Sequence, residues 1–182
     1  MPLKQMAIFY GDNIILRSCS TSLAGSVNLL IRALGSALKT KLSLIDARLQ
    51  QLTIWHTSHG ETSEQTIERL LENLIGEFED GRIPSESQMN WMPMESVNYT
   101  PHNLQYRKQM NGYVYFLDGE DAIDDGPIET LTVESVTVRR LASRNKTLPR
   151  GNNYRIVAIL KVVAKGESDA KTEANNSSLE SG

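Results

Sequence analysis

The chain has 182 residues, of which 40% are hydrophobic and 23% charged, and its formal net charge is −3. This length suits one domain with an ordinary core, and the net charge excludes wholesale coating of nucleic acid but allows a local anion-binding patch. Its single cysteine, Cys19, excludes an internal disulfide. The sequence has neither a signal-peptide pattern nor the ~20 consecutive apolar residues of a membrane span, so we expect a cytoplasmic protein.

The N-terminal segment predicts a pair of strands. Residues 6–10 alternate in side-chain character, Gly11-Asp12-Asn13 supplies turn chemistry, and residues 14–16 form a second apolar run. Two β-prone runs separated by such a turn indicate a hairpin.

A helix is predicted to follow. From Ser22 to Leu38 apolar residues recur every three or four positions, which is the spacing of one helical face. Gly25 and Gly35 lie inside this stretch and each costs about 1 kcal/mol relative to alanine. They therefore indicate close packing of the helix against another element.

The next segments predict a strand and the clearest helix of the chain. Residues 53–58 are rich in β-branched and aromatic side chains. Thr62 and Gln65 have the spacing of a capping box, and the apolar residues that follow repeat at helical spacing as far as Phe78. We expect the charged face of this second helix to be in solvent.

Residues 81–105 are expected to form a long loop, because three prolines lie among Ser, Gln, Asn and Met. Several large apolar side chains fall within it and could contact a protein partner. These are Trp91, Met92, Met94 and Tyr99.

The C-terminal part predicts about three further strands. Residues 113–117 alternate, and residues 128–141 alternate with a slip in phase that indicates a bulge. Residues 154–163 are apolar on both faces, so we expect a central strand covered on both sides. Residues 165–182 have almost no apolar content and are expected to be a disordered polar tail.

The predicted architecture is a single α+β domain over residues 1–164, with a mainly antiparallel sheet and two amphipathic helices. A long central loop divides it, and the polar tail of residues 165–182 follows. We find no internal repeat.

Two histidines, His56 and His59, are the natural starting point for catalysis or metal binding, because the chain has only three histidines. A zinc site needs three or four ligands, and residues three apart on a strand point to opposite faces. We therefore interpret both as polar residues near a strand end and expect no catalytic residue, metal or cofactor. The acidic stretch 118–129 lacks the glycine that a calcium loop needs at its sixth position, so we expect a solvated loop.

Charge is segregated between two neighbouring stretches. Residues 118–134 contain acidic side chains and no basic one, whereas residues 139–165 contain basic side chains and no acidic one. The second stretch predicts a hairpin whose turn contains Pro149 and Gly151. The basic residues assigned to this hairpin as a site for a partner or an anion are Arg139, Arg140, Arg144, Lys146, Arg150 and Arg155.

These features favour a non-enzymatic interaction or assembly protein that acts through copies of itself or through another protein. A viral matrix- or capsid-associated subunit is one concrete form of this class. One alternative is a protein that binds RNA or an anionic lipid through the basic hairpin of residues 139–155. Another is a small enzyme that uses His56 or His59. A third interpretation of the charges is that the two stretches are neighbours that neutralise each other.

Overall fold

A computed structural model describes residues 4–44, 48–92, 108–142 and 152–166 of the chain. In chain order, its elements are β1 (Lys4–Tyr10), β2 (Asn13–Ser20), α1 (Leu23–Lys41), β3 (Gln51–Gly60), α2 (Ser63–Glu79), β4 (Arg82–Met92), β5 (Lys108–Asp118), α3 (Glu120–Asp124), β6 (Ile128–Ala142) and β7 (Asn152–Ala164).

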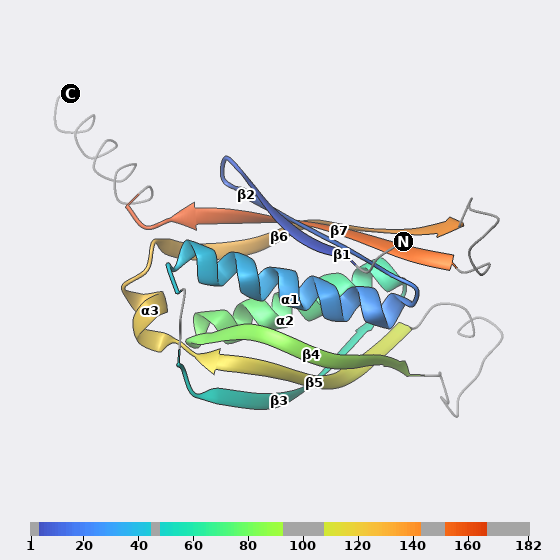
Figure 1. The fold of residues 1–182 in the computed structure, drawn as a ribbon, viewed down its shortest axis with the longest axis horizontal. Helices are drawn as coiled ribbons and strands as arrows, with labels where there is room; N and C mark the ends of the chain where they lie inside the picture. Colours follow the sequence, from blue (N-terminus) through green and yellow to red (C-terminus); the bar gives the residue numbers. More distant parts are fainter. Residues whose placement is uncertain (1–3, 45–47, 93–107, 143–151, 167–182) are drawn as a thin grey trace, which may run out of the picture.

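The described strands form two antiparallel sheets. One has four strands in the order β1-β2-β7-β6, and the other has three in the order β3-β5-β4. The helices α1 and α2 lie between the two sheets, as Figure 1 shows. The predicted α+β class with antiparallel pairing is therefore confirmed, and the strands divide into two sheets that enclose a shared helical layer.

A helix between two sheets must present apolar or small side chains on two sides, and α1 does so. Ser22 caps its N-terminus by accepting a hydrogen bond from the Gly25 N–H at 3.0 Å. The large residues of its predicted apolar face, such as Leu30 and Leu34, are buried. Small residues, including Ala33 and Gly35, are buried as well and leave room for the second sheet.

The contact between α1 and β4 depends on the absence of a side chain at Gly35. A Cβ atom built there would lie 2.0 Å from the carbonyl oxygen of Pro84, far inside van der Waals contact. Close by, the Asn28 Oδ1 accepts hydrogen bonds from the Met89 N–H at 2.8 Å and from the Ser87 hydroxyl at 2.6 Å. The sequence-based expectation that Gly35 marks close packing is thus confirmed.

The second helix agrees with its prediction in detail. The Thr62 hydroxyl accepts from the Gln65 N–H at 3.1 Å, while the Gln65 side chain accepts from the Glu61 N–H at 2.9 Å. The apolar residues of α2 are buried between the sheets. They are Ile67, Leu70, Leu71, Leu74, Ile75 and Phe78.

The long loop expected over residues 81–105 is wrong for residues 82–92, which form β4 and pair with β5. Gly81, with a φ of 93°, makes the turn from α2 into this strand. Trp91 is consequently not displayed in a loop, because it lies in β4 and packs against the core. The acidic loop is also corrected, since Glu120–Asp124 forms the short helix α3.

The last two strands confirm two predictions and correct a third. A register shift between Val133 and Ser135 is the expected bulge. Ala142 pairs with Asn152, at the position where the two strands of the basic hairpin were expected to reach its turn. β7 lies inside its sheet between β2 and β6. Among the described residues it is covered on one face only, however, because both long helices lie on the same side of this sheet (Figure 1).

Several expectations fall outside the described residues. They concern Met94 and Tyr99, the side chain of Met92, the hairpin tip with Arg144, Lys146 and Arg150, and the tail from residue 167. Within the described part of the chain, neither long helix is sufficiently long and apolar to cross a membrane.

Candidate functional site

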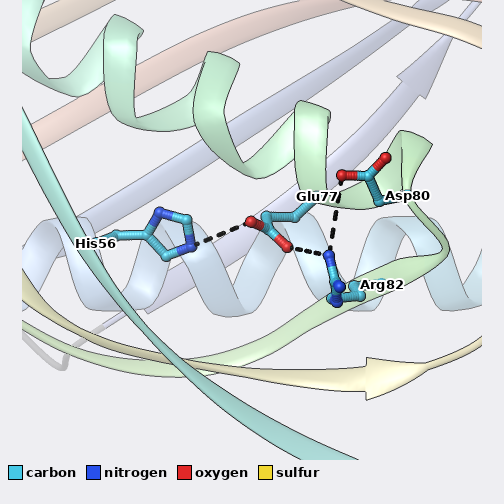
Figure 2. Close-up of polar contacts among 4 residues, drawn as sticks. All are labelled: His56, Glu77, Asp80 and Arg82. Carbon is cyan, nitrogen blue, oxygen red and sulfur yellow. Dashed lines mark hydrogen bonds and ion pairs between the residues drawn. The ribbon is translucent and has the colours of Figure 1, made fainter.

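His56 lies on the inner face of β3 in a cluster with charged residues of α2 and β4 (Figure 2). Its Nε2 atom is 3.8 Å from the Glu77 Oε1, which is too long for a hydrogen bond. The other oxygen of Glu77 accepts a hydrogen bond of 2.7 Å from the Arg82 guanidinium. Arg82 also lies 3.9 Å from the Asp80 carboxylate, so Glu77 stands between a histidine and an arginine.

The environment of His56 favours its neutral form. Its side chain is 11% exposed, and its ring makes an edge contact with Phe116 at a centroid distance of 5.7 Å. Burial lowers the pKa of His56 below its ordinary value of 6.5, and this outweighs the opposite effect of the Glu77 carboxylate. The Nε2 atom is buried without a hydrogen-bond partner.

This cluster connects three secondary-structure elements. Glu77 comes from the end of α2, Arg82 from the start of β4 and His56 from the middle of β3. A histidine beside a carboxylate is a common acid–base pair, yet this ring faces the protein interior. His59 is exposed on the opposite face of β3, as its spacing predicted, and its carbonyl accepts from Arg69 at 2.6 Å. Among the residues with described positions, no three His, Cys, Asp or Glu side chains are grouped to hold a metal ion.

The residues of the predicted basic hairpin that the structure describes lie at one end of the β6–β7 pair. Arg139 is directly opposite Arg155 in the register, and Arg140 is opposite Tyr154. All three arginines are exposed. We refer to Arg139, Arg140 and Arg155 as the basic stem. Glu64 of α2 reaches the strand beside this stem, where it accepts from the Val138 N–H at 2.9 Å.

Acidic side chains gather at the other end of the same strand pair. β6 begins at Ile128, opposite Ala164, and α3 lies just before it (Figure 1). Lys165 ties this region to the end of β7, because its Nζ donates to the carbonyl of Ile123 at 3.1 Å and to that of Asp124. We refer to the exposed acids here as the acidic end. They are Asp118, Glu120, Asp121, Asp124 and Asp125.

A pocket of about 430 Å³ opens within the acidic end. Asp118, Glu120 and Asp121 line it from one side, and Arg48 and Gln50 line it from the segment before β3. No ion pair among the described residues involves a member of the acidic end or of the basic stem. The members of both groups are exposed.

Sequence reasoning identified both charged stretches but did not predict that they lie at opposite ends of the β6–β7 pair. It missed the contact between His56 and Glu77, which no local pattern indicates, and it missed the position of Trp91 in a strand. Comparison with protein-family models gives no match for this chain, and comparison with curated proteins gives none either.

Proposed function

We propose that this chain is a non-catalytic assembly protein that associates head to tail, with the basic stem of one copy against the acidic end of the next. The observation that carries the proposal is the location of the two charged groups at opposite ends of the β6–β7 pair. From Ile128, beside the acidic end, to Arg139 of the basic stem, 11 steps of about 3.3 Å along β6 span roughly 36 Å. This is several times the screening length of about 8 Å at physiological salt.

Separation on this scale argues against mutual neutralisation within one molecule. Two groups of opposite sign at a distance of several screening lengths act as independent poles. Complementary poles attract and orient two copies before contact, which raises the rate and the specificity of association. Because the two surfaces differ, the contact is heterologous and produces a ring or an open filament. A repeating layer in a viral matrix or capsid is one setting that would use such a contact.

The alternatives receive less support from the geometry. A binder of single-stranded RNA needs aromatic rings beside its cations, but Tyr154 is the one aromatic side chain next to the described stem and it is half-buried. An enzyme built on the histidines would need them to converge, whereas His56 and His59 lie on opposite faces of β3. The head-to-tail contact uses residues that are exposed and have no ion-pair partner within the described chain.

Two complementary variants test the proposal. The first reverses the basic stem (Arg139→Glu, Arg140→Glu, Arg155→Glu), and the second reverses the acidic end (Glu120→Lys, Asp121→Lys, Asp124→Lys). We expect neither variant to self-associate, because each has like charges at both ends. An equimolar mixture should associate again, since one variant then supplies acidic ends and the other basic ends. Light scattering coupled to size exclusion gives the molar masses.

The wild-type protein should also dissociate toward the monomer as salt is added, because screening weakens both poles. The single reversal Glu72→Lys, at an exposed position of α2, is the control and should leave the molar mass unchanged. A wild-type protein that is monomeric at low salt would contradict the proposal. So would a mixture of the two variants that fails to associate.

A further inference from the structure

The outer face of the four-stranded sheet presents aliphatic side chains in a row that crosses three strands. Ile8 of β1 is opposite Ile15 of β2, which is in turn opposite Ile159 of β7. Along β2, buried residues alternate with these outward positions, because Ile14 and Leu16 face the helices. Ile8, Ile15 and Ile159 are half-buried by one another, and none belongs to the core between the sheets.

No element in the described part of the chain covers this row. Both long helices lie on the other side of the sheet (Figure 1). At the rim, Met6 is 51% exposed and Tyr10 is 73% exposed. A strand that is apolar on both faces, as β7 is, normally has both faces covered. A contiguous exposed apolar surface of this kind marks a site of interaction.

Cations border the aliphatic row, and the three strands that form it contain no acidic residue. Arg17 follows Ile15 by two positions in β2, and Arg155 and Lys161 lie on the same outward side of β7. All three are exposed. Asp12, in the turn between β1 and β2, lies beside Lys161, because Asn13 pairs with Lys161 and the Asp12 carbonyl accepts from the Val162 N–H at 2.7 Å. Glu129 and Glu134 lie at the two register shifts of the edge strand β6. In a chain whose net charge is −3, this face is locally cationic.

The combination of an aliphatic row with bordering cations restricts the kinds of partner that can bind this face. A second copy placed face to face would bring Arg17 and Lys161 against like charges, which is destabilising. The pocket in the acidic end of another copy offers carboxylates but only two aliphatic side chains, Leu49 and Ala122, to match Ile8 and Ile159. Nucleic acid would match the cations and leave the aliphatic row in water.

A membrane surface that contains anionic phospholipid complements both the cations and the aliphatic row of this face. Lipid phosphates attract arginine and lysine side chains, and the boundary of the acyl chains accepts aliphatic and aromatic side chains at the interface. We infer that the outer face of the four-stranded sheet docks on an anionic phospholipid bilayer, with Arg17 and Lys161 at the headgroups. The row of Ile8, Ile15 and Ile159 lies toward the acyl boundary.

Cosedimentation with lipid vesicles tests this inference on the full chain. The wild-type protein should bind vesicles of phosphatidylcholine mixed with phosphatidylserine and should not bind phosphatidylcholine alone. Binding should weaken as salt is added. Lys161→Glu should reduce the partition coefficient by at least about fivefold, and Arg17→Glu combined with Lys161→Glu by more than about tenfold.

The control for charge is Lys108→Glu, an exposed lysine at the start of β5 in the other sheet. Its partition coefficient should remain within about twofold of wild type, because it lies away from the docking face. Ile8→Ser with Ile159→Ser tests the apolar contribution and should also reduce binding several-fold. Light scattering and circular dichroism should show wild-type molar mass and folding for each variant, which separates this result from the head-to-tail assembly.

Three outcomes would overturn the inference. The first is equal binding to neutral and anionic vesicles, because the cations would then have no role. The second is no binding to either kind of vesicle, including the case in which single-stranded RNA binds instead. The third is equal loss of binding in Lys161→Glu and Lys108→Glu, because the face would then not be the determinant.

Discussion

The outer faces of the two sheets differ in charge and in the kind of apolar side chain, although their inner faces are alike. Both inner faces are mainly aliphatic and pack on the same two helices, and the three-stranded sheet adds Phe116 and Trp91. The outer face of the four-stranded sheet carries isoleucines bordered by cations. The outer face of the three-stranded sheet is aromatic and polar instead, with Trp55, Tyr113, Tyr115, Gln88 and Asn111, and Glu86 lies opposite Tyr115.

This difference separates what folding requires from what it leaves free. The inner positions are fixed by the need to fill the space around α1 and α2 at high density. The outer positions face no further layer of the described chain, so packing between layers does not dictate their chemistry. The inner layer should therefore determine stability, and the outer faces should determine partners. Substitutions at inner and outer positions test this division.

The largest effect is expected at the centre of the inner layer. Leu71 of α2 is fully buried between the sheets. Leu71→Ala should lower the free energy of unfolding by about 2–5 kcal/mol, because it removes buried methyl groups and leaves a cavity. Glu72→Ala, the exposed neighbour, should change it by no more than about 0.5 kcal/mol. Urea denaturation measures both, and equal costs would mean that the two faces of α2 are not distinguished by packing.

A second pair of variants compares two glycines of the helical layer. Gly35→Ala would place a Cβ 2.0 Å from the Pro84 carbonyl oxygen, so α1 and β4 must move apart. We expect a loss of about 1–3 kcal/mol from this overpacking. Gly76 of α2 has no atom within 4 Å of an added Cβ. Gly76→Ala should instead stabilise by about 0.5–1 kcal/mol through helix propensity, and the same sign for both would contradict the packing argument.

The sequence predicted the elements whose signals are local. The hairpin of β1 and β2, both long helices with their caps, and the bulge in β6 follow from periodicity, capping residues and turn chemistry. β4 was missed because its sequence is polar and contains Pro84, so that nothing local favours a strand. It forms because β5 pairs with it and Asn28 of α1 binds its backbone, which are long-range contacts.

The candidate site was predictable in composition but not in arrangement. Both charged stretches are evident from the sequence, and the register of β6 with β7 places them at opposite ends. The sequence could not supply this distance, since a break in β6 would have folded the acids back onto the arginines. The same limit applies to His56, whose carboxylate neighbour Glu77 comes from a different element.

On the outer face of the three-stranded sheet, a smaller effect is expected from an aromatic pair. The rings of Trp55 and Tyr113 make an edge contact with centroids 4.9 Å apart, and about half of each side chain is exposed. A double-mutant cycle with Trp55→Ala and Tyr113→Ala should give a coupling of about 0.5–1.5 kcal/mol. Neither change should alter binding to anionic vesicles. A loss of vesicle binding in Trp55→Ala would break the distinction between the two outer faces.

The smallest effect concerns His56, the histidine on the inner face of the three-stranded sheet. It is a pH dependence of the free energy of unfolding, and we expect it to disappear at neutral pH. Burial holds the pKa of His56 below 6.5 in the folded protein, against the opposite influence of Glu77. Below about pH 6.5 the unfolded chain therefore binds a proton that the folded chain resists, so the free energy of unfolding falls as the pH falls through this range. His56→Gln should remove this part of the pH dependence, whereas His59→Gln, on the exposed face of the same strand, should retain it.

Urea midpoints of the wild type and both variants, measured between about pH 7.5 and about pH 5, provide the comparison. Identical pH slopes for the wild type and His56→Gln would show that the buried ring does not couple protonation to folding.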